Sequence, residues 1–244
     1  MTRIVSRAVL ALVMTLFAAT AVQVTTAPAA HAYNWTRTLK VGDTGADVRE
    51  LQIRVAGWAA DGPARTYVAV DGIFGPGTEA AVKRFQQAYK LPIDGIVGAQ
   101  TQAALNALED SDGSTRHFNW SEFHSKDGSG FNNGKIAASQ VKENVRRLMW
   151  KLEAVRKKAG DAPIIINSGF RSVSHNAAVG GASNSQHMYG IAADIVISGK
   201  SVSQAISYAQ SSGFSGIIRY STFTHVDSRV EYPQYGAASW YWSV

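Results

Sequence analysis

The apolar positions divide the chain into a helix-rich first part and a second part that mixes helices with strands. In the first part, helical spacing predicts three short helices. The first begins near Asp43-Thr44, and the other two follow Gly-rich turns at 71–78 and 94–101 that repeat each other. Each turn ends in a Thr that we expect to cap its helix, and Asp71 and Asp94 are expected to form the turns. The pattern predicts a compact three-helix domain over residues 36–108.

A polar stretch without apolar periodicity, residues 109–115, predicts a linker. After it, a long helix capped by Ser139 is predicted from one apolar stripe: Val141, Val145, Leu148, Leu152 and Val155. The stripe predicts a core face. We expect the opposite, charged face to be solvated, and it carries Lys142, Arg146, Arg147, Lys151 and Lys157.

Short β-branched runs predict strands in this second domain, which we place at residues 116–244. The runs are 163–168, 190–197, 216–220 and 223–230, with a helix opened by a capping box at Ser201 and Gln204 between the second and the third. The chain ends in a group of aromatic residues, for which packing against the sheet is favoured over stacking on glycans.

The first 32 residues have the features of a secretory signal. Arg3 and Arg7 precede an apolar run, and Ala30-His31-Ala32 has the small-x-small form of a cleavage site. A retained membrane anchor is the alternative, but the run is short for a spanning helix. We therefore expect a secreted protein with no membrane span after cleavage.

Composition narrows the choice of partner and chemistry. The net charge of +6 favours an anionic partner such as a cell-wall polymer, while the absence of a dense Lys/Arg cluster argues against nucleic acid. The chain has no cysteine, which excludes disulfides, a thiolate metal site and a cysteine nucleophile.

Candidate metal ligands occur where the second predicted strand begins. His187 and Asp194 are seven residues apart, and both are ordinary Zn²⁺ ligands, although a hydrogen-bonded structural pair is the alternative. His225, on a later strand, is the candidate third ligand, and Asp227 shares its face. Arg171 follows the first strand, and its planar guanidinium is suited to binding a carboxylate at two points. A surface salt bridge is the alternative interpretation of Arg171. His117 and His124 are expected to be structural or solvated.

Two stretches of the sequence resemble known families. Leu39 to Asp43, Val48 to Leu51 and 71–86 resemble the three-helix peptidoglycan-binding domain, which implies attachment to the cell wall. Residues 168–172, 179–182, 185–194 and 223–229 resemble the zinc D-Ala-D-Ala carboxypeptidase family of M15-like peptidases, which also includes cell-wall endopeptidases and phage endolysins.

The second resemblance implies an α+β fold with a central antiparallel sheet and one Zn²⁺ per chain. It implies that His187, Asp194 and His225 hold the metal and that Arg171 binds the terminal carboxylate of a peptidoglycan stem peptide or another anionic group. Ser185 would be a hydrogen-bonding residue of the active site.

The chain departs from this family at one position. Several members have a carboxylate three residues before the last zinc histidine as general base, where this chain has Thr222. Asp227 could take the proton instead, or orient His225, and orientation is slightly preferred.

The sequence therefore predicts a secreted, monomeric zinc peptidase, foremost a D-Ala-D-Ala carboxypeptidase. A cross-link endopeptidase and an inactive cell-wall-binding protein remain as alternatives.

Overall fold

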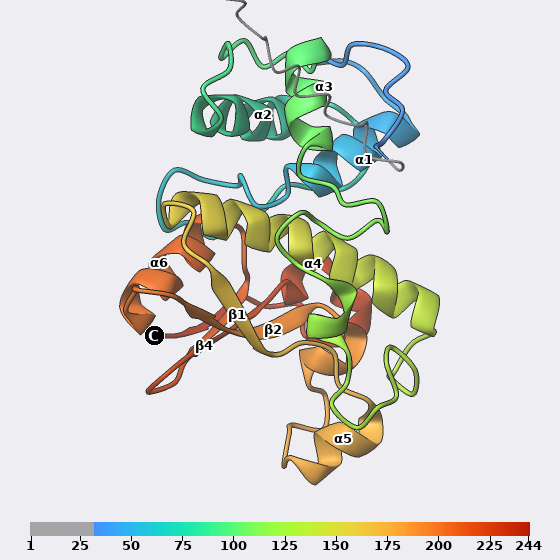
Figure 1. The fold of residues 1–244 in the computed structure, drawn as a ribbon, viewed down its shortest axis with the longest axis vertical. Coiled ribbons are helices and arrows are strands. Elements are labelled where there is room, and N and C mark those ends of the chain that lie inside the picture. Colours follow the sequence, from blue (N-terminus) through green and yellow to red (C-terminus); the bar gives the residue numbers. More distant parts are fainter. Residues whose placement is uncertain (1–31) are drawn as a thin grey trace, which may run out of the picture.

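The structure is a computed structural model that describes residues 32–244. The expected secretory signal lies outside the described residues, apart from its last position. Helices form the first part of the chain, and a five-stranded sheet with helices forms the second (Figure 1). The expected fold class, a small helical domain before an α+β domain, is confirmed. Among residues 32–244, no helix combines the length and the apolar character needed to cross a membrane.

Three helices form the N-terminal part: α1 (Ala46–Arg54), α2 (Pro76–Ala88) and α3 (Ala99–Asn106). The repeated turns before α2 and α3 are built alike. The N–H of Ile73 donates to Asp71 Oδ1 at 2.9 Å, and the N–H of Ile96 donates to Asp94 Oδ1 at 2.8 Å. Both aspartates form their turns, as predicted.

The expected threonine caps are wrong. Both α2 and α3 start directly after a glycine, and no side chain caps either helix. Thr78 and Thr101 are buried, and their hydroxyls accept hydrogen bonds from the amides of Gln52 and Gln86 at 3.1 and 3.2 Å. The repeat therefore encodes a buried Gln–Thr contact, which links each turn to the preceding helix.

The second part contains the sheet and its surrounding helices. The strands are β1 (Ile164–Ser168), β2 (Ala192–Ile197), β3 (Gly216–Arg219), β4 (Thr224–Asp227) and β5 (Tyr241–Ser243). The α-helices are α4 (Ala138–Lys158), α5 (Val173–Ala178) and α6 (Val202–Ser211), and the 3-10 helices are η1 (Trp120–Phe123), η2 (Gln186–Tyr189), η3 (Arg229–Glu231) and η4 (Pro233–Tyr235).

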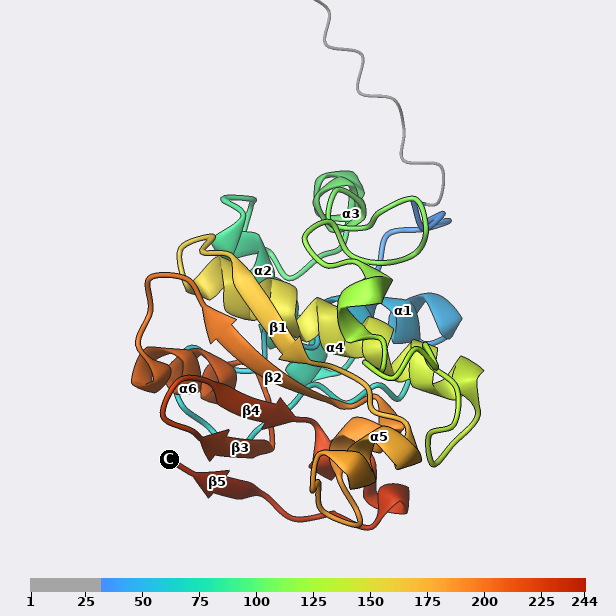
Figure 2. The same cartoon turned by 60° about the horizontal axis from the view of Figure 1, so that its bottom comes forward.

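The strand order is β1-β2-β4-β3-β5. The first four strands are antiparallel, as expected, but β5 pairs parallel to β3 at the sheet edge (Figure 2). The apolar pattern did not predict β5. Its Trp242 packs against the core and donates from Nε1 to the Phe214 carbonyl at 3.2 Å. Trp242 thus packs on the sheet as expected of the aromatic chain end, whereas Tyr232 and Tyr235 pack with Tyr189 and Ile191.

Several element boundaries differ from the prediction, and the strand expected over 223–230 ends at Asp227, before the 3-10 helix Arg229–Glu231. Ser139 lies inside the first turn of α4 and does not cap it. The strand predicted from residue 190 begins at Ala192, because Gly190 has a φ of 72° and ends η2 in the left-handed region. A side chain at Gly190 would also lie 2.9 Å from the Val141 carbonyl.

Helix α4 lies between the sheet and the N-terminal helices (Figure 1). Val145 and Leu152 belong to the core under the sheet. Trp150 and Ala154 belong instead to the core of the N-terminal part. One helix therefore contributes side chains to both cores.

The prediction of a solvated charged face on α4 holds for Lys142, which is exposed, but is wrong for Lys151. Lys151 is completely buried and donates to the Gly213 carbonyl and to Ser228 Oγ, both at 2.7 Å. Lys151 and Arg147 both form ion pairs with Glu231. Neighbouring segments cover this side of α4, and apolar periodicity alone does not reveal them because the contacts are polar.

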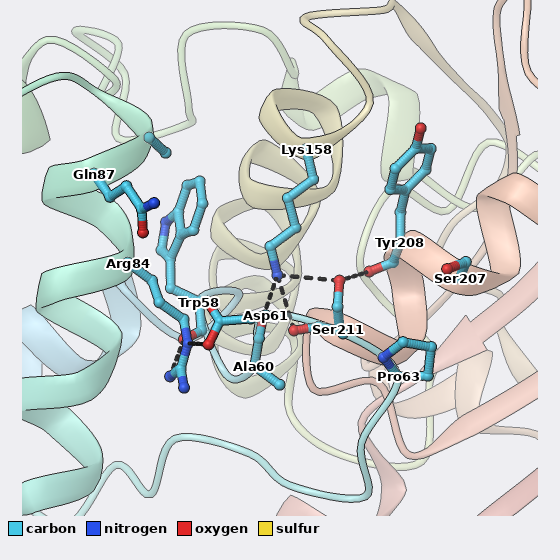
Figure 3. Close-up of a pocket in the computed structure, with 12 residues that line it drawn as sticks. Trp58, Ala60, Asp61, Pro63, Arg84, Gln87, Lys158, Ser207, Tyr208 and Ser211 are labelled. Carbon is cyan, nitrogen blue, oxygen red and sulfur yellow. Dashed lines mark hydrogen bonds and ion pairs between the residues drawn. The ribbon is translucent and has the colours of Figure 1, made fainter.

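Lys158, near the end of α4, joins the two parts of the molecule. Its ammonium donates to the carbonyls of Gly57 and Ala60 and to that of Ser211 on α6, at 3.1, 3.3 and 2.8 Å. Figure 3 shows the ammonium pointing between these segments, at the wall of a pocket. Burial, with Arg84 acting in the same direction, lowers the pKa of Lys158 to about 7.

The polar stretch 109–115 packs against the rest of the chain at both of its ends. The carboxylate of Glu109 accepts a hydrogen bond from Arg54 Nη2 at 2.7 Å, and Arg54 is itself buried. Ser114 and Thr115 are buried as well. The connection is thus packed into the structure and is unlike a flexible tether.

Candidate metal centre

Three side chains from separate elements converge on one point. His187 comes from η2, Asp194 from β2 and His225 from β4. Asp194 and His225 are direct cross-strand partners. His225 Nδ1 lies 3.0 Å from Asp194 Oδ1 and 3.1 Å from His187 Nε2, and the latter lies 3.2 Å from Asp194 Oδ1. Among residues 32–244, these three form the group with metal-ligand spacing.

The local sequence explains why these side chains face the same way. In β2, Ala193 and Ile195 point into the core, so Asp194 between them points to the opposite face. In β4, Val226 points into the core, which places His225 and Asp227 on the side of Asp194. The alternation of two strands thus delivers a carboxylate and an imidazole to one sheet face.

The outer ring nitrogens of both histidines have fixed partners. His187 Nδ1 lies 2.6 Å from the Gly169 carbonyl, and His225 Nε2 lies 3.0 Å from Asp227 Oδ2. When these nitrogens carry the protons, His187 Nε2 and His225 Nδ1 are free to bind a metal. Two imidazoles and one carboxylate, buried and oriented in this way, fit a catalytic zinc site with an open fourth position.

Asp227 lies behind the metal group. Its side chain is fully buried and does not line the pocket described below. Arg229 donates to it from Nη2 at 2.6 Å to Oδ2, and from Nε at 2.9 Å and its backbone N–H at 3.0 Å to Oδ1. With one oxygen on His225 and both on Arg229, the carboxylate is placed to orient the ring, which favours that role over proton transfer.

Gly216 is needed to accommodate Asp227. The two residues are register partners on β3 and β4, and a Cβ on Gly216 would lie 2.1 Å from Asp227 Oδ2. We expect Gly216→Ala to displace the carboxylate and weaken zinc affinity by about 10- to 100-fold, the usual cost of losing an outer partner of a metal ligand. A competition titration with a chromogenic chelator measures this.

Gly62→Ala is the matched control, because a Cβ there meets open space. Equal zinc affinity in the two variants would contradict the orienting role of Asp227.

The charges at the centre depend on one another. Burial lowers the pKa of His187. Burial alone would do the same to His225, but hydrogen bonds with Asp194 and Asp227 outweigh it and raise the pKa to about 9. Burial alone would raise the pKa of Asp194, but its contacts with the two histidines hold the pKa well below its ordinary value.

Zinc uptake should therefore release a proton. Below pH 9 the metal-free protein carries an imidazolium at His225, because its folded pKa lies above the ordinary 6.5. The metal must displace the Nδ1 proton, so we expect zinc affinity to rise about tenfold per pH unit between pH 7 and 9 and then to level off. Calorimetry in buffers of different ionisation enthalpy counts the protons, and zero protons released at pH 7 would contradict this expectation.

A pocket opens onto the three donors. It is lined by two arginines, a carboxylate, the histidines and small or aromatic residues: Arg171, Val179, Gly180, Gly181, Ala182, Asn184, Ser185, Gln186, His187, Asp194, Ile218, Tyr220, His225, Arg229, Ala237 and Tyr241. Among these described residues, Asp194 is the only carboxylate. Thr222 is exposed and does not line the pocket.

The structure brings Arg171 and Ser185 into the same site. Arg171 follows β1, and its Nη2 donates to Asp194 Oδ2 at 2.6 Å while its Nε donates to Ser168 Oγ at 2.8 Å. The Arg171 side chain is 16% exposed, so it is no surface salt bridge. Ser185 lines the pocket directly before η2.

Some residues of the site carried no recognisable signal in the sequence. Tyr220 and Tyr241 line the pocket, but an aromatic side chain alone does not distinguish a pocket wall from a core. Gly216 was also missed, because its role depends on the register of two strands. His117 and His124 lie outside the metal group, and His117 Nδ1 contacts Glu153 Oε2 at 2.9 Å.

Comparison with known proteins gives the family. Residues 116–227 match the family model for peptidase M15, and residues 44–105 match that for a peptidoglycan-binding domain. The zinc D-Ala-D-Ala carboxypeptidase of Streptomyces albus G is 44% identical over 186 residues, which are 76% of this chain and 71% of that protein. The chain belongs to the peptidase M15 family. Both resemblances stated from the sequence are confirmed.

Other similarities of this M15 peptidase are partial. A spore cortex-lytic enzyme of Bacillus cereus is 40% identical over 76 residues, 30% of this chain and 27% of that protein. A solved phage endolysin from Burkholderia AP3 phage is 28% identical and covers 46% of this chain and 36% of its own, with a TM-score of 0.26.

Proposed function

We propose that this protein is a zinc-dependent D-Ala-D-Ala carboxypeptidase that hydrolyses peptidoglycan stem peptides. The observation that carries the proposal is the convergence of His187, Asp194 and His225 at a pocket that also contains Arg171. Membership of the M15 family and the similarity to the Streptomyces enzyme support it.

The three side chains would hold one Zn²⁺ through His187 Nε2, Asp194 Oδ1 and His225 Nδ1. Zinc supplies Lewis acidity, which polarises a carbonyl and activates water near neutral pH. The chain fixes the geometry of this site from outside: the Gly169 carbonyl holds the His187 ring, and Asp227 holds the His225 ring.

Arg171 would bind the terminal carboxylate of the peptide. Its Nε and Nη2 are already bonded to Ser168 and Asp194, while its Nη1 has no hydrogen-bond partner among residues 32–244. The guanidinium is therefore held rigidly with both N–H groups of Nη1 free, which favours binding a chain end in one register. The Ser185 hydroxyl, on the same pocket, would donate to the bound peptide.

The proton acceptor is not another carboxylate of this pocket. Asp194, the one carboxylate that lines it among residues 32–244, is bonded to Arg171 and close to both histidines. Asp227 would therefore act on the reaction through the orientation of His225.

The N-terminal part would bind peptidoglycan and keep the enzyme on its insoluble substrate, where attachment raises the effective concentration. The match to the peptidoglycan-binding family model supports this role. We propose that the protein is exported, acts at the cell wall and works as a monomer.

Product analysis on defined stem peptides tests the proposal. With zinc, we expect mass spectrometry to detect free D-Ala and a peptide one residue shorter, and we expect neither after treatment with a chelator. Cross-linked dimers cut between stems would identify an endopeptidase instead. Wall binding and full zinc content without any cleavage would identify an inactive cell-wall-binding protein.

A further inference from the structure

The pocket contains a second arginine, Arg229, to which the proposed reaction assigns no contact with the substrate. Arg171 contacts Asp194, which lies beside Nδ1 of His225, whereas Arg229 contacts Asp227, which lies beside Nε2 of the same ring. The two nitrogens of an imidazole point in different directions. Arg171 and Arg229 therefore stand on opposite sides of His225, and both line the pocket.

Arg229 is held firmly but is not fully used. Its Nε and Nη2 both donate to Asp227, and the Tyr241 ring centroid lies 5.3 Å from its Cζ. Its Nη1 makes no hydrogen bond to any residue between 32 and 244. The side chain is 17% exposed and lines the pocket, so an incoming group can approach the guanidinium. Fixing two of the three nitrogens removes most of the entropy cost of using the third.

Within residues 32–244 the pocket offers no hydrogen-bond acceptor to Nη1 of Arg229. Asp194 is the only carboxylate among the described lining residues, and it is bonded to Arg171. Each of the two guanidinium groups is paired with one carboxylate, Arg171 with Asp194 and Arg229 with Asp227, and a divalent metal would add positive charge that no lining residue offsets. A peptide with a single terminal carboxylate would satisfy Arg171 alone.

We propose that Arg229 binds a second carboxylate of the substrate, on the amino-terminal side of the scissile bond. This rests on the proposed function, in which Arg171 takes the chain end. Because Arg229 lies across His225 from Arg171, it faces the part of the peptide beyond the metal donors. The favoured substrate is then an acidic peptide with a free upstream carboxylate, as opposed to its amidated form. A charge-assisted hydrogen bond in a partly buried site corresponds to a preference of about 10- to 100-fold.

Two synthetic peptides test this assignment. Both end in D-Ala-D-Ala and are identical except that one upstream side chain carries either a carboxylate or its primary amide. For the zinc-loaded protein we expect kcat/KM to favour the acid by about 10- to 100-fold. In Arg229→Gln the ratio should fall to about one, and Arg229→Lys should keep part of it because the charge is retained.

The ratio separates recognition from a structural effect. If Arg229 only supported Asp227, the substitution would slow both peptides by the same factor and leave the ratio unchanged, which would overturn the proposal. Calorimetric binding of both peptides to the metal-free protein gives the same ratio without turnover. If neither peptide is cleaved, the proposed function fails, and this binding ratio still decides on Arg229. Cleavage of both peptides at equal rates, with equal binding, would overturn the assignment of Arg229 and leave the proposed function intact.

Discussion

The variant His187→Ala should lose zinc and at least about a thousandfold in kcat/KM on peptides ending in D-Ala-D-Ala. It removes one of three convergent donors, and the remaining two, Asp194 and His225, leave an incomplete set. A catalytic metal supplies several kcal/mol of transition-state stabilisation, and each 1.36 kcal/mol is tenfold in rate. Zinc content by elemental analysis and peptide turnover should fall together.

His124→Ala is the matched control. His124 is exposed and lies outside the metal group, with its ring edge-on to Phe131. It should keep its zinc and its activity. If His187→Ala released D-Ala at the rate of the control, both the metal centre and the peptidase proposal would be refuted.

The second large effect is on stability. Glu231→Ala should lower the free energy of unfolding by about 3–5 kcal/mol, because it leaves Lys151 and Arg147 without their carboxylate. The side chains of Glu231 and Lys151 are 2% and 1% exposed, so water cannot replace the lost partner. Burial already lowers the pKa of Lys151. The midpoint of thermal unfolding should fall by about 10 °C.

Glu143→Ala provides the comparison on the same helix. Its side chain is 52% exposed and its nearest ion pair, with Arg146, is 3.8 Å long. The loss there should stay below about 0.5 kcal/mol. Equal losses in the free energy of unfolding of the two variants would mean that the buried ion pairs of Glu231 stabilise the protein no more than a surface ion pair does.

The sequence predicted the metal donors better than their surroundings. His187, Asp194 and His225 were proposed because residue type and strand alternation are local properties, and a family motif supported them. The partners of those donors depend on tertiary contacts. Nothing near Gly169 in the sequence indicates that its carbonyl holds His187, and the clash that reserves Gly216 for Asp227 exists only once β3 and β4 pair.

The errors in the predicted fold have the same origin. Thr78 and Thr101 occupy positions typical of caps, yet buried glutamine amides use their hydroxyls. The charged face of α4 was predicted to be solvent-exposed, because the periodicity of one helix contains no information on the segments that pack against it. Lys151 is buried there because three oxygen partners from the distant segment 213–231 surround its ammonium.

Because α4 belongs to both cores, it limits how far the active pocket can move while the N-terminal part is bound to the cell wall. A catalytic domain on a flexible linker could reach every stem peptide within the length of that linker after a single binding event. Here Trp150 and Ala154 fix α4 in the core of the N-terminal part, and Lys158 fastens its far end to the same side. The active pocket then stays at a fixed distance from the part that would bind the wall. Each binding event would therefore bring only the nearby stem peptides within reach of the pocket. To reach further stem peptides the protein would have to dissociate and rebind, so the rate of dissociation from the wall would limit the overall rate.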